Sequence, residues 1–178
     1  MIRLFTAIEI PESVRLRLSL LQGGVPGARW VPIENMHLTL RFIGEVDHAV
    51  ARDIDDVLAE IRAPSFPLAL KGVGEFGRKE ARSLWAGVSD GQALQHLAAK
   101  VESALQRMGL PAETRKYSPH LTLARLKDVA IGEIQTFLTA HALFQSEPFE
   151  VKAFTLFSSQ KTASGSRYRM ESVYPLAG

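Results

Sequence analysis

The tetrapeptide HLTL occurs twice in this chain, at residues 37–40 and again at residues 120–123. The chain has only five histidines, and two of them begin this same tetrapeptide, which indicates an internal repeat rather than coincidence. The two copies are separated by close to half of the 178 residues. The repeat therefore predicts two halves built on one structural plan.

The residues around the two copies follow the same order of elements. Apolar residues at helical or alternating spacing predict, in each half, a helix, the HLTL strand, a second helix and a β-hairpin. The expected helices are 12–22, 47–62, 91–108 and 130–141, and the expected strands are 3–10, 29–32, 37–44, 66–76, 83–88, 120–126, 148–159 and 167–175. No low-complexity linker separates the halves. We expect an α+β fold with two pseudo-symmetric lobes, each an antiparallel sheet with helices outside, in a single bilobed domain spanning residues 1–178, with both HLTL strands in a central cleft.

Composition limits the classes of function. The apolar fraction of 46% and the charged fraction of 22% are typical of a globular protein, and a net charge of +2 excludes a polycation. The chain has no cysteine, which excludes disulfides, a thiolate nucleophile and cysteine-ligated zinc. The apolar start is interrupted by Arg3 and Glu9 and ends at Pro11, which is typical of a strand and not of a signal peptide. No run approaches the roughly 20 apolar residues of a membrane helix, so we expect a cytoplasmic protein, by default a monomer.

The spacing within each HLTL segment indicates acid–base chemistry. Side chains two residues apart in a strand share a face, so His37 and Thr39 point one way and the leucines point the other; His120 and Thr122 form a second such pair. A histidine with a pKa of about 6.5 can act at neutral pH as a base or as an acid. Two facing histidines therefore suit in-line displacement at phosphorus, with the threonine hydroxyls donating to the non-bridging oxygens. This scheme needs no metal and no cofactor.

The two segments resemble the paired H-x-T-x signature of the two-histidine phosphoesterase superfamily. Their flanks, RLFTAIEIP, ARWVPIENMHLTLRFIGEV, SLWAGV and YSPHLTLARL, are similar to the RNA 2′,3′-cyclic phosphodiesterase branch of the LigT or ThpR type, over nearly the whole chain and in the same order. The resemblance implies hydrolysis of 2′,3′-cyclic phosphate RNA ends to 2′-phosphomonoesters, with His37 as proton donor and His120 as proton acceptor. Some members of this branch also join RNA ends through a 2′–5′ linkage.

Other functions remain open at this point. The resemblance implies RNA 3′ ends carrying a 2′,3′-cyclic phosphate as the partner, including tRNA fragments, and leaves room for small cyclic nucleotides. Alternative enzymes are a 2′–5′ RNA ligase that joins tRNA halves and a phosphodiesterase for small cyclic nucleotides. A module that binds RNA ends without turnover is the non-enzymatic alternative. Such a module has no need of two matched acid–base groups, which favours an enzyme.

Two arginines are further candidates for contacting phosphate. Arg41 lies four residues after His37 and shares its face if the strand is regular, where it would face the RNA backbone; a solvated strand residue is an equal alternative. Arg125 lies five residues after His120, so simple alternation points it to the opposite face. The family often has a basic residue there, and a β-bulge would reconcile that pattern with the alternation.

Three other patterns have structural explanations. GVGEFG at 72–77 matches G-x-G-x-x-G, but it leads into a turn at 77–82 and a strand instead of opening a helix, which predicts a hairpin and not a dinucleotide site. A zinc site built on the two histidines lacks a third ligand at the usual spacing. The remaining candidates, for stacking on bases or for packing in the lobes, are the aromatic residues Trp30, Phe42 and Tyr117.

Overall fold

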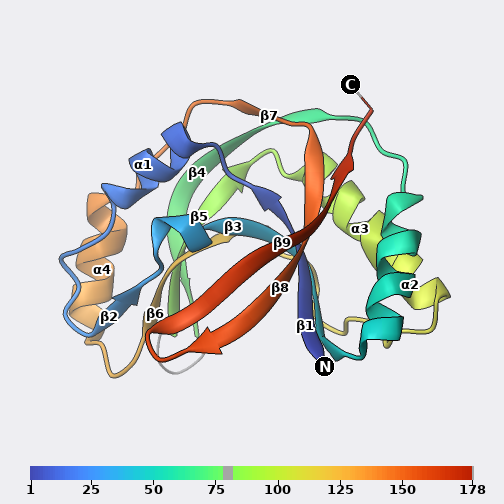
Figure 1. The fold of residues 1–178 in the computed structure, drawn as a ribbon. Helices are drawn as coiled ribbons and strands as arrows, with labels where there is room; N and C mark the ends of the chain where they lie inside the picture. The colour runs from blue at the N-terminus through green and yellow to red at the C-terminus, as the bar shows by residue number, and fades with distance from the viewer. Residues whose placement is uncertain (78–81, 178) are drawn as a thin grey trace.

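A computed structural model describes residues 1–77 and 82–177, and most of the turn predicted at 77–82 lies outside them. The described residues form four α-helices, one 3-10 helix and nine strands in two antiparallel sheets, which confirms the predicted α+β class (Figure 1). The helices are α1 (Glu12–Ser19), η1 (Ile33–Asn35, the 3-10 helix), α2 (His48–Ala59), α3 (Gln92–Arg107) and α4 (Ile131–Ala140). The strands are β1 (Ile2–Glu9), β2 (Ala28–Trp30), β3 (His37–Val46), β4 (Phe66–Phe76), β5 (Ser83–Ser89), β6 (Leu121–Leu126), β7 (Phe149–Val151), β8 (Ala153–Thr162) and β9 (Gly165–Pro175).

The two sheets have matching strand orders. Sheet A has the order β3-β1-β8-β9, and sheet B has the order β2-β6-β5-β4-β7. In each sheet the HLTL strand, β3 or β6, pairs with an antiparallel neighbour, β1 or β5, which pairs in turn with β8 or β4. The short strand β2 is an addition at the edge of sheet B. The strand order therefore carries the pseudo-symmetry that the repeat predicts.

Each sheet contains strands from both halves of the sequence. The early strand β2 pairs with β6 in sheet B, and the late strands β8 and β9 join β1 in sheet A. The single strand predicted for 148–159 is wrong. The chain pairs with β4 as β7, breaks at Lys152 and continues as β8 in the other sheet. Alternation along the sequence continues through such a crossing, so the pattern alone does not reveal it.

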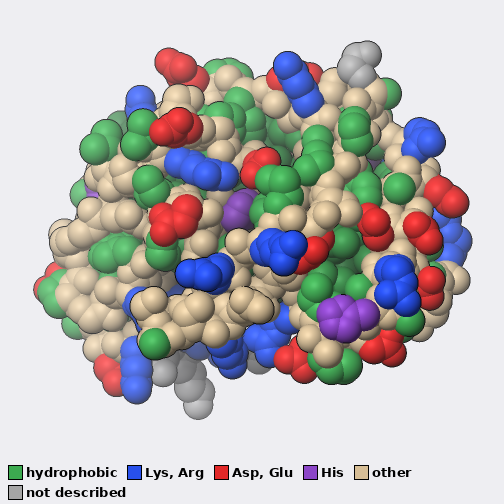
Figure 2. Space-filling view, viewed as in Figure 1, with side chains coloured by type: hydrophobic (Ala, Val, Ile, Leu, Met, Phe, Trp, Pro, Cys, Tyr) green, Lys and Arg blue, Asp and Glu red, His purple; other side chains and the backbone are tan. Residues whose placement is uncertain are grey.

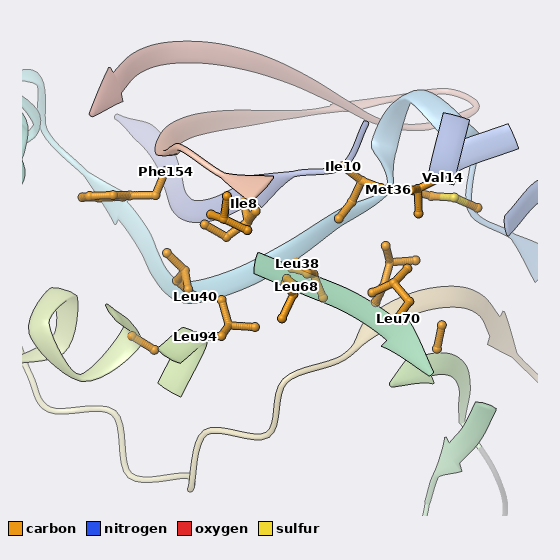
Figure 3. Close-up of a cluster of buried hydrophobic side chains, with 14 of the residues drawn as sticks. Ile8, Ile10, Val14, Met36, Leu38, Leu40, Leu68, Leu70, Leu94 and Phe154 are labelled. Carbon is orange, nitrogen blue, oxygen red and sulfur yellow. The ribbon is translucent and has the colours of Figure 1, made fainter. Parts of the chain in front are cut away.

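The leucines of both HLTL segments lie in the hydrophobic core. Leu38, Leu40, Leu121 and Leu123 are buried in a cluster that contains residues of both sheets. Figure 3 shows Leu38 close to Leu68 of β4, among side chains from β1, α3 and β8. Burial of one leucine stabilises a fold by about 1.5–3 kcal/mol. These four side chains therefore fix which face of each strand turns inward, and the histidines and threonines take the other face.

The helices cover the core through their apolar stripes. In α2, the Asp47 side chain caps the helix by accepting a hydrogen bond from the Val50 N–H at 2.8 Å, and Ile54 and Leu58 are buried. The longer α3 buries six side chains and contacts both α2 and β3. Between α2 and α3 lie two shallow hollows of about 430 and 290 Å³, lined by residues 57–62 and 99–108 and not by either histidine. Within the described ranges, no helix has the length and hydropathy to cross a membrane.

Candidate active site

Each HLTL strand contains a β-bulge at the last residue of its tetrapeptide. In β3, Thr39 and Arg41 oppose consecutive residues of β1, so Leu40 is the extra residue; in β6 the extra residue is Leu123. A bulge shifts the alternation of faces by one residue. The histidine and threonine of each segment share one face of the sheet. The first residue after the bulge then points to the core, and the second residue after it points again to the face of the histidine. We call the face of each sheet that carries its HLTL histidine the histidine face.

The two histidines are held in the same way. The Nδ1 atom of His37 lies 3.1 Å from the carbonyl oxygen of Asn35, and the Nδ1 atom of His120 lies 2.7 Å from the carbonyl oxygen of Ser118. A carbonyl oxygen only accepts, so each Nδ1 carries hydrogen and donates. Each bond thereby selects the tautomer that leaves Nε2 to accept a proton in the neutral ring. The second ring nitrogen of both histidines is thus available for proton transfer.

A phenylalanine packs against each histidine. In each sheet this phenylalanine lies two strands away from the HLTL strand. The ring centroids of Phe157 and His37 are 4.4 Å apart, and those of Phe76 and His120 are 4.7 Å apart. Phe157 lies on β8 and Phe76 lies on β4, which hold equivalent places in the two sheets. No motif in the sequence marks these two residues. Only the strand order shows that they correspond.

The middle glycine of GVGEFG, Gly74, makes room for an aromatic side chain. A Cβ atom on Gly74 would lie 2.2 Å from the ring of Trp85, so only glycine fits beneath this indole. Trp85 in turn packs against Phe76 at 5.2 Å and lies 6.4 Å from His120. Residues 66–76 are strand β4, paired with β5. The hairpin interpretation of this stretch is confirmed.

The surroundings of the two histidines differ. His37 is only 9% exposed and also lies near the rings of Phe5 and Tyr168, at 6.4 and 5.8 Å, whereas His120 is half-buried. Burial, as the largest cause, and the positive charge of Arg15 together lower the pKa of His37 to about 4, and the bond to the Asn35 carbonyl opposes them in part. Ligand-free His37 is therefore neutral at pH 7.

The cation near His37, Arg15, comes from α1 and is absent from the sequence predictions. Helix α1 contacts η1, the 3-10 helix that ends at Asn35, two residues before His37. The Nε atom of Arg15 is buried and has no hydrogen-bond partner among residues 1–77 and 82–177. The only sequence signal is its place beside the buried Val14 on a short helix, which does not distinguish it from a solvated arginine.

The orientation expected for Arg41 is wrong. The bulge at Leu40 turns Arg41 to the core, where it is 8% exposed. Its guanidinium forms a salt bridge with Glu102 and donates to the carbonyl oxygens of Phe42 and Pro111, both at 2.6 Å. Protein groups thus occupy the guanidinium, and Arg41 stabilises the fold instead of facing a ligand.

Arg125 lies on the same face as His120 and Thr122, as the family pattern indicates. Simple alternation predicts the opposite face. The bulge at Leu123 sends Ala124 to the core, where it is fully buried, and returns Arg125 to the face of Thr122. Arg125 is exposed and Thr122 is half-buried. The histidine face of sheet B therefore carries His120, Thr122 and Arg125 in a row.

The three aromatic candidates have different places. Trp30 packs against Phe137 of α4 at 5.8 Å, on the core side. Phe42 is 60% exposed and lies 5.9 Å from Phe5. Tyr117 is half-buried, and its hydroxyl donates to the carbonyl oxygen of Thr39 at 2.9 Å. Burial raises the pKa of Tyr117, so this hydroxyl stays protonated and remains a donor.

The bond from Tyr117 joins the two HLTL segments. Tyr117 directly precedes the second segment, and Thr39 belongs to the first. Strands β3 and β6 also contact each other, although they belong to different sheets. The two histidines thus stand at the starts of adjoining strands, each with Nδ1 occupied by a backbone carbonyl, which suits one acid and one base acting on one group through Nε2. In the described part of the chain, no three metal-ligating side chains of His, Asp or Glu gather at one place.

Comparison with known proteins gives the family. The sequence profile of the 2′-5′ RNA ligase superfamily matches residues 12–163. The chain belongs to this superfamily. It is 37% identical to the RNA 2′,3′-cyclic phosphodiesterase of Aeropyrum pernix, over 78% of this chain and 93% of that protein. It is 34% identical to the protein of the same name from Thermotoga maritima, over 94% and 92%.

A solved structure shows the same fold. The Escherichia coli protein LigT complexed with 3′-AMP superimposes with a TM-score of 0.81 and 28% identity, over 99% of both chains. The family resemblance of the two HLTL segments and their flanks is thereby confirmed.

Proposed function

We propose that this member of the superfamily hydrolyses the 2′,3′-cyclic phosphate at RNA 3′ ends to a 2′-phosphomonoester. The observation that carries the proposal is the matching tethering of His37 and His120 through Nδ1, at the starts of two strands in contact, with no hydrogen bond to either Nε2 among the described residues. The names of the relatives from Aeropyrum and Thermotoga support this substrate. LigT in complex with 3′-AMP supports a site for a nucleotide phosphate.

The proposed reaction is one displacement at phosphorus with two proton transfers. Neutral His120 accepts a proton at Nε2 from water as the water oxygen bonds to phosphorus. The bond from phosphorus to O3′ breaks, and His37 donates its Nε2 proton to O3′. The Thr39 and Thr122 hydroxyls donate hydrogen bonds to the non-bridging oxygens, and Arg125 adds positive charge. The anionic substrate opposes the charge of Arg15 and raises the pKa of His37, so binding itself prepares the acid.

A short RNA ending in a 2′,3′-cyclic phosphate tests this proposal, incubated with the protein in EDTA. We expect turnover and a 2′-phosphate product, identified by chromatography against both monophosphate standards. A 3′-phosphate product would contradict O3′ as the leaving group. Loss of activity in EDTA, restored by zinc or magnesium, would contradict the metal-free mechanism.

A second candidate activity is RNA ligation through a 2′–5′ linkage, favoured by the description of the matching superfamily. There an RNA 5′-hydroxyl replaces water as the attacking group, and the same two histidines transfer the protons. Adding a 5′-hydroxyl RNA to the hydrolysis assay distinguishes it, because ligation gives a longer product. Retention of the cyclic-phosphate RNA without any conversion would instead support a module that only binds RNA ends.

We propose that residues 1–178 act as one bilobed unit, as a monomer in the cytoplasm. The sharing of strands between the halves supports one unit. Light scattering on the purified protein measures the assembly state, and fractionation of cells that make it measures the location.

A further inference from the structure

Two arginines lie directly opposite each other on neighbouring strands. Arg29 of β2 pairs with Arg125 of β6 in the antiparallel ladder. Like charges directly opposite each other destabilise a sheet. Both side chains are exposed, and no carboxylate lies within 4.0 Å of either in the described ranges. Within those ranges the two positive charges are thus uncompensated, and an anionic ligand would neutralise them.

The pair lies beside the proposed catalytic groups. Arg125 shares the histidine face with Thr122, and the ladder register places Arg29 on that same face, one strand outward. With the bulge between them, Thr122 and Arg125 are about two strand steps apart, or about 7 Å. That is on the order of the separation between neighbouring phosphates in an extended RNA strand, so a second phosphate can reach the pair while the first lies between the histidines.

The β8–β9 hairpin orients Arg29. One Nη atom of Arg29 donates to the carbonyl oxygen of Ser164, at the tip of this hairpin, at 3.3 Å. Figure 1 places the tip close to β2, and Figure 2 shows Lys and Arg side chains gathered around it. This bond holds the guanidinium without neutralising it and leaves its other N–H groups for a ligand. Guanidinium groups bind phosphate through paired hydrogen bonds.

We propose that Arg29, with Arg125 between it and the catalytic groups, binds the internucleotide phosphate adjacent to the terminal cyclic phosphate. The inference rests on the proposed function and names its substrate class, an RNA of at least two nucleotides rather than a cyclic mononucleotide. Recognition through a backbone phosphate carries no base information. The site therefore accepts RNA ends of any sequence and selects for a chain.

Three substrates with the same reacting group test the inference: adenosine 2′,3′-cyclic phosphate, the dinucleotide ApA ending in a cyclic phosphate, and that dinucleotide with a neutral methylphosphonate linkage. We expect the wild type to have a kcat/KM at least about tenfold higher on the charged dinucleotide than on the neutral one, the effect of one charge-assisted contact. Arg29→Ala should bring the charged dinucleotide down to the level of the neutral one. It should change the other two substrates much less.

Two further variants sharpen the test. Arg29→Lys keeps the charge without the planar fork and should give an intermediate preference. Arg52→Ala removes an exposed arginine from α2, far from β2 in the fold, and should keep the wild-type preference.

Each remaining outcome has a definite meaning. Equal rates on the charged and the neutral dinucleotide, or an equal loss on both in Arg29→Ala, would overturn the second-phosphate site while the proposed function stands. No turnover of any of the three substrates by folded wild type would overturn both.

Discussion

The two HLTL segments have the same local geometry and different surroundings. In both, Nδ1 donates to the carbonyl two residues earlier, a phenylalanine from the strand next but one packs on the ring, and a bulge follows the threonine. These shared features need only backbone atoms, a matching strand order and four identical residues. The repeat therefore duplicates a local structure that holds the histidine by Nδ1 and presents its Nε2 atom on one face of the sheet.

The differences lie in the residues that the repeat does not copy. His37 is buried among aromatic rings with Arg15 nearby, whereas His120 is half-buried. At the second position after the bulge, one half has the exposed Phe42 and the other has Arg125. The first segment thus holds a buried histidine that resists protonation, and the second carries an exposed arginine on its histidine face. The residues that the two segments share therefore set the geometry of each histidine. The residues that they do not share make the two histidines differ in their acid–base properties.

The largest effect should come from removing either histidine. His37→Ala and His120→Ala should each lower kcat on a cyclic-phosphate RNA by about 10²–10⁴-fold, because each removes one proton transfer. The double variant should be little worse than the poorer single one, since groups that act as a unit are not additive. Rates of the four proteins, with folding checked by circular dichroism, provide the measurement. One dispensable histidine beside one essential histidine would show that the symmetry is structural and not catalytic.

The burial of His37 should make stability depend on pH. Its pKa is about 4 in the folded protein and about 6.5 in an unfolded chain, so the unfolded state binds more protons between these values. The contribution of neutral His37 to the free energy of unfolding is complete above pH 6.5. It is lost as the pH falls, by about 3 kcal/mol at pH 4. Urea unfolding at several pH values should show a shallower decline for His37→Gln than for wild type. His96→Gln, at an exposed position on α3, is the control and should follow wild type.

The sequence predicts the repeat, the faces of the histidines and the core leucines, because these depend on local alternation. It does not predict the bulges, because a bulge depends on how a strand pairs with its neighbour. This is why the alternation gave the wrong face for Arg41 and left Arg125 undecided. The positions of Phe76, Phe157 and Arg15 were missed for a related reason, since each reaches its histidine from a distant segment or another element. The positions that the sequence does not predict are those that depend on the pairing of strands distant in the chain.

The two arginines after the bulges should separate stability from activity. Arg41→Ala reproduces the alanine of the other half and leaves Glu102 without its buried partner, which should lower the free energy of unfolding by about 2 kcal/mol. Arg125→Ala removes an exposed side chain and should lower kcat/KM with little change in stability. Urea unfolding and initial rates on both variants give the comparison. A stable Arg41→Ala protein with a large loss of rate would return Arg41 to the phosphate site.

The smallest effect concerns the bond that joins the two segments. Tyr117→Phe removes the hydroxyl that donates to the Thr39 carbonyl and keeps the ring. One lost hydrogen bond costs about 1 kcal/mol of stability. Because this bond spans the two histidine strands, the loss should also lower kcat by about fivefold, roughly the same 1 kcal/mol expressed as misplacement of the acid relative to the base.

A matched variant separates this effect from general loosening. The Tyr174 hydroxyl donates to the Asp55 carboxylate at 2.6 Å, between β9 and α2, so Tyr174→Phe removes a bond of the same kind that joins no histidine strand. That bond reaches a charged group, so Tyr174→Phe should cost at least as much stability as Tyr117→Phe. Its kcat should nevertheless stay near that of wild type. If both variants lose kcat in proportion to stability, Tyr117 only supports the fold. If Tyr117→Phe alone loses kcat, the geometry between the two segments depends on this hydroxyl.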